Sequence, residues 1–147
     1  MRIFVDSCIF LDCLEDERSY RTLRRVKNDN HQIITSITVV GETVEVCFRK
    51  SKDLAKIVEL WRELDVEFIY PVSQVRFCCL CLDDLLREEK VYGSSVTDRT
   101  HLAYAIAHEL DFFVTSRSEL RSLKKPSDCL LKTKIVDIEG LREELGY

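Results

Sequence analysis

The chain has little glycine or proline and no long apolar run. It contains only four Gly and two Pro among 147 residues, which excludes collagen-like and most low-complexity architectures. No stretch approaches the roughly 18–20 apolar residues of a membrane-spanning helix. The N-terminus lacks the basic segment and apolar stretch of a signal peptide. We therefore expect a cytoplasmic protein without membrane association.

The length and composition fit one folded domain over residues 1–147. A chain of about 150 residues buries close to 70% of its unfolded surface, which is enough for a hydrophobic core. Hydrophobic residues make up 46% of the chain and charged residues 33%, with 22 Lys+Arg against 26 Asp+Glu. This slight acidic excess does not exclude a nucleic-acid partner, because affinity for phosphates follows local Lys and Arg placement.

The seven cysteines are an odd number and cannot all pair within one chain. Cys78, Cys79 and Cys81 lie together in an apolar run, but C-C-x-C is not the repeated C-x-x-C spacing of a zinc site. We expect reduced, mostly buried thiols, which are the norm in cytosolic proteins. A disulfide or a metal site is the alternative.

Short apolar runs and amphipathic stretches alternate along the chain. The apolar runs predict five strands, at Arg2–Val5, Gln32–Thr35, Val66–Tyr70, Asp111–Thr115 and Thr133–Val136. The amphipathic stretches predict helices within Ile9–Asn30, Ser36–Phe48, Ser51–Leu64, Gln74–Lys90, Ser94–Leu110 and Glu119–Leu123, before a final helical turn. Strands separated by one or two helices predict an α/β fold with a parallel sheet covered on both faces.

Three acidic residues stand where such a fold binds ligands, near the carboxyl ends of strands. Asp6 ends the first strand, Glu42 lies in the helix after the second strand, and Asp98 lies in the first turn of a later helix. Each also has an ordinary structural explanation. Asp6 suits a helix N-cap, Glu42 a surface position, and Asp98 a capping box with Ser95. Glu45 is a competing candidate with more polar neighbours.

The three acids together indicate a ligand site more strongly than any one of them does alone. A parallel sheet would bring Asp6 and the starts of the Glu42 and Asp98 helices to one edge. Converging carboxylates repel each other, and a bound divalent cation removes that penalty. All-oxygen ligands suit Mg²⁺ or Mn²⁺, which can activate water and stabilise charge during phosphodiester displacement.

The chain resembles the PIN domain family, the ribonuclease fold of many VapC-type toxins. The segments that carry the resemblance are V-D-S-C-I-F-L at Val5–Leu11, S-I-T-V-V-G-E at Ser36–Glu42, T-D-R-T-H-L-A-Y-A-I-A at Thr97–Ala107 and D-F-F-V-T-S at Asp111–Ser116. The resemblance implies a three-layer α/β/α sandwich with a five-stranded parallel sheet, and Mg²⁺- or Mn²⁺-dependent cleavage of RNA. By position, Asp6, Glu42 and Asp98 match the family's acidic metal ligands. The family also implies a small antitoxin partner and a homodimer.

Two positions depart from the family pattern. Cys8 stands where the family usually has Asn, Ser or Thr, with Ser7 beside it. Ser116 and Arg117 follow Thr115, where the family often has a further acid or Asn. Ser116 can hydrogen-bond a metal-bound water, and Arg117 is suited to a phosphate. With three acids rather than four, we expect a single metal and weak affinity.

The sequence is therefore compatible with three functions. The first is a metal-dependent ribonuclease that uses Asp6, Glu42 and Asp98. The second is a catalytically weak or silent PIN-like module for binding or assembly, suggested by the absent fourth acid. The third is another α/β protein with an acidic pocket, such as a phosphatase or a receiver domain. The dehalogenase-type phosphatase needs D-x-D after the first strand, whereas this chain has Asp6, Ser7 and Cys8 there.

Basic side chains form two runs. The first run fits a solvated helix face, and its members are Arg18, Arg21, Arg24, Arg25 and Lys27. The second run follows the fourth strand, near the expected site, and its members are Arg117, Arg121, Lys124 and Lys125. We expect phosphate contacts from the second run.

Overall fold

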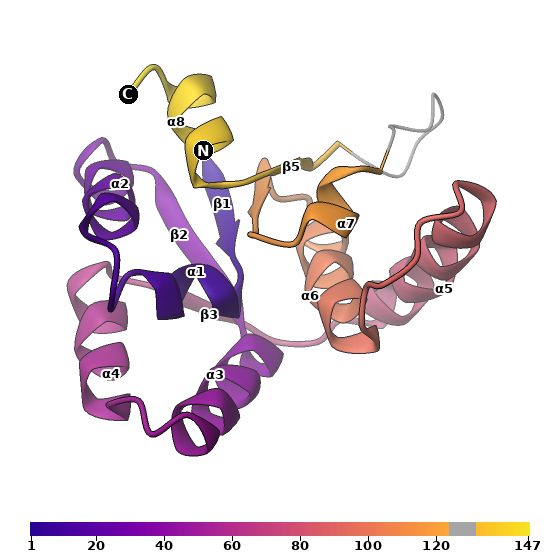
Figure 1. The fold of residues 1–147 in the computed structure, drawn as a ribbon. Helices are drawn as coiled ribbons and strands as arrows, with labels where there is room; N and C mark the ends of the chain where they lie inside the picture. Colours follow the sequence, from indigo (N-terminus) through magenta and orange to yellow (C-terminus); the bar gives the residue numbers. More distant parts are fainter. Residues whose placement is uncertain (124–131) are drawn as a thin grey trace.

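A five-stranded parallel sheet forms the centre of the molecule (Figure 1). The structure, a computed structural model, describes residues 1–123 and 132–147. The strands are β1 (Arg2–Val5), β2 (Gln32–Ser36), β3 (Glu67–Ile69), β4 (Phe112–Val114) and β5 (Lys134–Val136). Their order is β3-β2-β1-β4-β5, and all pairs are parallel. The five predicted strands are confirmed to within one residue at either end.

Eight helices connect or follow these strands in the described part of the chain. They are α1 (Ser7–Asp12), α2 (Glu17–Asn28), α3 (Ile37–Arg49), α4 (Leu54–Glu63), α5 (Ser73–Glu88), α6 (Val96–Ala107), α7 (Ser118–Arg121) and α8 (Ile138–Leu145). The stretch Ile9–Asn30, predicted as one helical segment, forms parts of two helices. The reason is Asp16, whose carboxylate caps α2 by accepting from the backbone N–H groups of Arg18 and Ser19. None of the helices in the described residues has the length and apolarity of a membrane span.

The helices cover both faces of the sheet. The helices α2 and α4 lie on one side and the α5–α6 pair on the other (Figure 1), as right-handed connections between parallel strands require. The helix α8 packs against α2, β4 and β5, whereas α6 packs against β4 and α5. The expected three-layer α/β/α architecture is confirmed.

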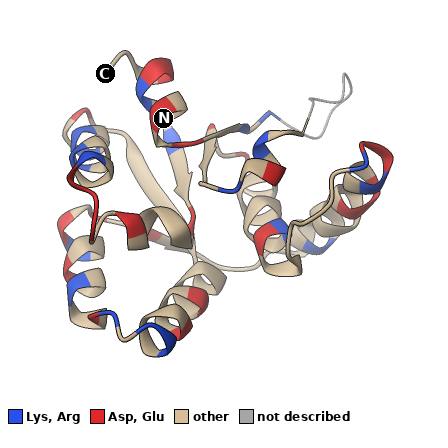
Figure 2. Cartoon of the chain, viewed as in Figure 1, with Lys and Arg blue, Asp and Glu red and all other residues tan. Residues whose placement is uncertain are grey.

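The central strand β1 lies in the hydrophobic core. Ile3, Phe4 and Val5 are fully buried there. The ring of Phe4 stacks on that of Phe113 in β4, with centroids 5.3 Å apart. Most of the strand ribbon is uncharged, and most of the charged residues lie on helices and connections (Figure 2). Apolar burial therefore fixes β1 and β4, and with them the polar residues that follow each strand.

The six cysteines in the described residues are free thiols, namely Cys8, Cys13, Cys47, Cys78, Cys79 and Cys81. Cys47 and Cys78 are buried, and the other four are partly buried. Burial raises the pKa of Cys78 and Cys79, so these thiols stay protonated at neutral pH. Cys129 lies outside the described residues.

Candidate metal centre

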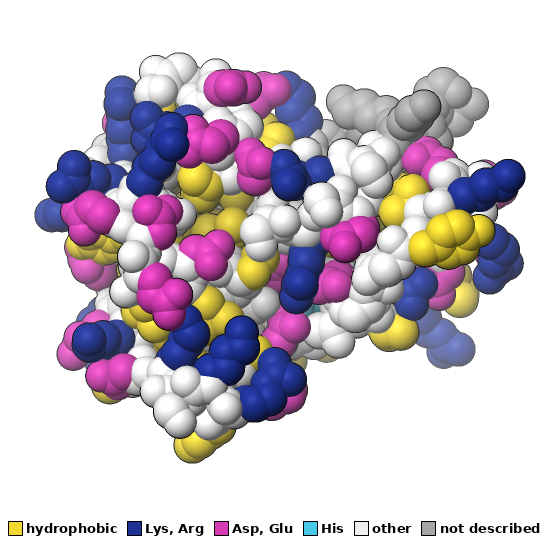
Figure 3. Space-filling model, in the orientation of Figure 1, with side chains coloured by type: hydrophobic (Ala, Val, Ile, Leu, Met, Phe, Trp, Pro, Cys, Tyr) yellow, Lys and Arg dark blue, Asp and Glu magenta, His cyan; other side chains and the backbone are white. Residues whose placement is uncertain are grey.

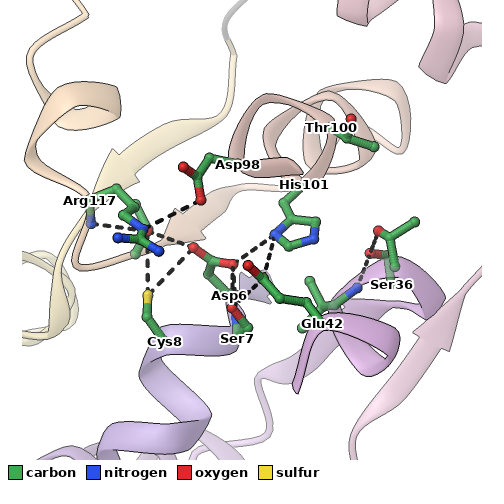
Figure 4. Close-up of polar contacts among 12 residues, drawn as sticks. Asp6, Ser7, Cys8, Ser36, Glu42, Asp98, Thr100, His101 and Arg117 are labelled. Atoms are coloured by element: carbon green, nitrogen blue, oxygen red, sulfur yellow. Dashed lines mark hydrogen bonds and ion pairs between the residues drawn. The ribbon is translucent and has the colours of Figure 1, made fainter. Parts of the chain in front are cut away.

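Asp6 lies at the carboxyl end of β1, in the centre of the candidate site (Figure 4). Its side chain is 1% exposed. Oδ1 accepts a hydrogen bond from the backbone N–H of Ser7 at 2.8 Å, so Asp6 is the N-cap of α1. The capping role expected from the sequence is therefore present. Capping uses only part of the carboxylate's capacity, because each oxygen can accept two hydrogen bonds.

Two further side chains contact the Asp6 carboxylate. His101 Nδ1 lies 2.9 Å from Oδ1, and the Thr115 hydroxyl donates to Oδ2 at 2.7 Å. Burial acts to raise the pKa of Asp6, but His101, Thr115 and the Ser7 N–H outweigh it, so the pKa is lowered. Asp6 is therefore a buried carboxylate that is ionised at neutral pH.

Glu42 approaches Asp6 from α3. The Ser7 hydroxyl donates to Glu42 Oε2 at 2.6 Å, and His101 Nδ1 lies 3.6 Å from the same oxygen. The Glu42 side chain is only 21% exposed. Glu45, one turn further along, is 72% exposed and pairs with Arg49 on the surface. The structure thus brings Glu42, and not Glu45, to the site.

Asp98 lies at the start of α6, where it has two partners. It forms the capping box with Ser95: each side chain accepts from the other's backbone N–H at 3.0 Å. Its Oδ1 also lies 3.4 Å from Arg117 Nε. In the described residues, the ligand atoms that lie within 4.8 Å of one another belong to Asp6, Glu42 and His101, and this group does not include Asp98. Asp98 therefore borders the cluster.

His101 is a member of this cluster that the sequence did not single out. It is fully buried, and it lies three residues after Asp98 on the same face of α6. Nδ1 faces Asp6 and Glu42 (Figure 4). Nε2 has no hydrogen-bond partner in the described part of the chain. The one available sequence signal was this i, i+3 spacing from a candidate ligand.

The two positions that depart from the family pattern lie on the other side of Asp6. Cys8 Sγ is 3.5 Å from Asp6 Oδ2 and accepts from the Ser116 N–H at 3.4 Å. Burial, and then the negative charge of Asp6, raises the pKa of Cys8 to about 11. Ser116 thus meets the site through its backbone, and its side chain is exposed. Arg117 is half exposed and reaches Asp98.

The first basic run lies on α2, where four of its arginines pair with acids. The pairs are Arg18–Glu139, Arg21–Glu17, Arg24–Glu63 and Arg25–Asp29. In the second run, Arg121 pairs with Asp137, and Lys124 and Lys125 lie outside the described residues. Figure 3 shows Lys and Arg interspersed with Asp and Glu on one face of the molecule. Arg117 is thus the basic residue that the structure places beside the acidic cluster.

A family model of the PIN domain matches residues 3–126. The chain belongs to the PIN domain family. Members of the family are generally metal-dependent nucleases. No curated protein sequence matches this PIN domain.

Two solved structures share its fold. One is a chain of VapBC2 from Rickettsia felis bound to a DNA fragment from their promoter, with a TM-score of 0.65 and 17% identity over 93% of this chain and 98% of that one. The other is a chain of VapBC-1 from nontypeable Haemophilus influenzae, with a TM-score of 0.63 and 13% identity over 95% of this chain and 99% of that one. At such identities the likeness shows the fold.

Proposed function

We propose that this PIN domain is a ribonuclease that depends on Mg²⁺ or Mn²⁺. The observation that carries the proposal is the convergence of Asp6 and Glu42 at the carboxyl edge of the sheet. No ion pair joins either carboxylate to a Lys or Arg in residues 1–123 and 132–147. Two such carboxylates favour a cation between them.

The donor set fits a divalent metal. Asp6 and Glu42 supply carboxylate oxygens, and the three ligand atoms of the cluster lie within 4.8 Å of one another. Ser7 donates to Glu42 and Thr115 donates to Asp6, so hydrogen bonds hold both carboxylates in place. Such supporting hydrogen bonds orient metal ligands in proteins.

Each residue of the site has a proposed role. Asp6 and Glu42 would hold the cation, and Asp98 would complete the acidic set at its border. The cation would supply activation of water and stabilisation of the charge that develops on the phosphodiester. Arg117 would bind an RNA phosphate next to the site, since its planar guanidinium matches phosphate oxygens. Ser116 would use its exposed hydroxyl to hydrogen-bond water beside the cation.

The biological setting we propose is a VapBC-type toxin–antitoxin pair in the cytoplasm. Support comes from the family resemblance and from the likeness of the fold to chains of two VapBC complexes. We therefore propose a small antitoxin partner and a homodimer. Co-purification with a small protein encoded immediately upstream, and a molar mass from light scattering of twice 17.2 kDa, are the expected results.

The test of the ribonuclease is cleavage of single-stranded RNA in Mg²⁺ or Mn²⁺. We expect cleavage by the parent protein and its abolition by EDTA. Asp6→Asn and Glu42→Gln should each lower the rate by about a hundredfold or more, because each removes a charge that would hold the metal. Glu45→Gln, on the same helix but on the surface, is the matched control and should retain the parent rate.

Cleavage by Asp6→Asn at the rate of the parent protein would contradict the proposal.

The second candidate function is a catalytically weak or silent PIN-like module, which the absence of a fourth acid after Thr115 favours. Calorimetric titration with Mn²⁺ separates the two. Mn²⁺ binding that depends on Asp6 and Glu42, together with RNA cleavage, supports the ribonuclease. Absence of both supports the silent module.

A further inference from the structure

We propose that His101 Nδ1 is a ligand of the metal centre, which makes this a mixed nitrogen and oxygen site with a preference for Mn²⁺ and related transition-metal ions over Mg²⁺. The proposal rests on the metal binding in the proposed function and adds a residue that is not one of the three expected acidic ligands. His101 thereby joins Asp6 and Glu42 in the cluster, whereas Asp98 lies at its border.

The positions of the donor atoms support this assignment. His101 Nδ1 lies 2.9 Å from Asp6 Oδ1 and 3.6 Å from Glu42 Oε2. Two ligands bound at about 2.1 Å to one ion, at a right angle, lie roughly 3 Å apart. The imidazole nitrogen therefore already lies close to the spacing of a neighbouring ligand from one oxygen of each carboxylate.

The protonation states of the ring show why a cation suits this position. If Nδ1 carries the only proton, it donates to Asp6, and Nε2 is a buried acceptor without a partner. If both nitrogens are protonated, Nε2–H is a buried donor without a partner. If only Nε2 is protonated, as ligation through Nδ1 requires, Nε2–H is again without a partner, so this nitrogen does not distinguish the states. In that last state the Nδ1 lone pair faces two carboxylates with no positive charge between them. A metal ion supplies that charge and uses the lone pair.

Helix α6 and the sheet hold the ring in this orientation. His101 is fully buried on α6, and the carboxylates come from the end of β1 and from α3. The other two histidines have different partners: His108 Nε2 contacts the Tyr70 carbonyl at 3.1 Å, and His31 Nδ1 lies 3.3 Å from the N-terminal amine. His101 is therefore the histidine that the fold aims at the acids.

Nitrogen ligation determines which metal the site selects. Carboxylate and water ligands suit Mg²⁺, whereas imidazole suits transition metals. Mg²⁺ also demands near-ideal octahedral geometry and gives up its waters reluctantly. A buried site with one imidazole should thus bind Mn²⁺, Co²⁺ or Ni²⁺ more tightly than Mg²⁺.

The direct test is pulsed electron paramagnetic resonance of Mn²⁺ bound to the intact protein. We expect electron-spin-echo modulation from a directly bound ¹⁴N nucleus in the parent protein, and its loss in His101→Gln. Calorimetry should show Mn²⁺ affinity lowered about tenfold or more in His101→Gln. The Mg²⁺ affinity should change by less than about threefold, because the ion keeps its oxygen ligands and waters.

The matched control is His108→Gln, at the C-cap of the same helix, which should retain the ¹⁴N modulation and the Mn²⁺ affinity. Thermal unfolding without metal separates a folding defect of His101→Gln from a lost ligand. The parent spectrum alone decides the proposal even if that variant fails to fold. Bound Mn²⁺ without ¹⁴N modulation would overturn it.

The test of His101 as a ligand can fail or succeed independently of the test of the ribonuclease. If the parent cleaves RNA and Asp6→Asn does not, while bound Mn²⁺ shows no nitrogen ligand, the ribonuclease stands and the ligand role of His101 is wrong. If Mn²⁺ binds with nitrogen ligation and no RNA is cleaved, the ligand role stands and the proposed ribonuclease is wrong. If neither Mn²⁺ nor Mg²⁺ binds, both are wrong.

Discussion

Arg117 Nε lies 3.4 Å from Asp98 Oδ1, at the border of the candidate metal centre. Burial acts to lower the pKa of Arg117, but nearby negative charge, chiefly that of Asp98, raises it overall. A cation thus stands close to the acidic cluster, where the family often has a further acid or Asn. Arg117 is half exposed and is available to a substrate from outside.

We expect Arg117→Gln to weaken RNA binding several-fold, with a larger effect on KM than on kcat, because one phosphate contact is lost. The slope of log affinity against log salt concentration should fall by about one for a single lost phosphate contact. Fluorescence anisotropy over a KCl series measures both effects. Arg87→Gln removes a surface pair with Asp84 on α5 and is the control. An unchanged salt slope in Arg117→Gln would count against the phosphate contact.

The two possible roles of Asp98 can be separated by paired substitutions. Asp98→Asn keeps an oxygen that can accept from the Ser95 N–H, so the free energy of unfolding should fall by less than about 1 kcal/mol. It removes the charge, and Mn²⁺ affinity and RNA cleavage should fall together if Asp98 completes the acidic set.

The partner variant Ser95→Ala removes the capping hydroxyl from α6 and keeps the Asp98 charge. It should cost about 1 kcal/mol of stability and leave Mn²⁺ affinity near that of the parent. Chemical denaturation and calorimetry provide the two measurements. If Asp98→Asn binds Mn²⁺ with the same affinity as the parent protein, Asp98 caps α6 and does not contribute to the metal site.

Ser7 positions Glu42 through the hydrogen bond at 2.6 Å between its hydroxyl and Oε2. We expect Ser7→Ala to lower Mn²⁺ affinity about tenfold, because a ligand without its supporting hydrogen bond is less well oriented. Ser7→Thr retains a hydroxyl and should restore much of the affinity. Calorimetry on both variants tests this, and equal affinities for Ser7→Ala and the parent would show that Glu42 needs no such support.

Local pattern was sufficient to predict the sheet and two members of the cluster. Buried strands such as Arg2–Val5 are short apolar runs with turn or cap residues after them, and the alternation with helices implies parallel pairing. Asp6 follows such a run directly. Glu42 could be preferred to Glu45 because residues three and four apart share a helix face, so its apolar neighbours indicated partial burial.

His101 could not be found in this way, because its role depends on tertiary contacts. It lies in the stretch T-H-L-A-Y-A, whose buried Leu102, Ala103 and Tyr104 give no local sign of a polar site. Its ring reaches Asp6 only because strand order places β4, and α6 packed on it, beside β1. The pairing of Arg117 with Asp98 likewise joins two separate elements, so the sequence suggested a phosphate role for Arg117 without its acidic partner.

Cys13 is expected to lower the free energy of unfolding of the protein at alkaline pH. Burial, and then the negative charges of Asp12 and Asp16, raises the pKa of Cys13 from its usual 9.0 to about 12. Below pH 9 the thiol is protonated in both the folded and the unfolded chain, so it has no effect on stability. Above pH 9 the unfolded chain releases this proton while the folded chain keeps it, so unfolding becomes more favourable as pH rises.

The expected slope between pH 9 and 11 is at most about 1.4 kcal/mol of unfolding free energy per pH unit from this one group. Urea denaturation of the parent and of Cys13→Ala at pH 8, 9, 10 and 11 measures it as the difference between the two proteins. Lysine and tyrosine titrations occur in both proteins and largely cancel in that difference. The gap should be constant from pH 8 to 9 and should then shift steadily in favour of Cys13→Ala. A constant gap up to pH 11 would mean that the Cys13 thiol ionises as readily in the folded protein as in the unfolded chain.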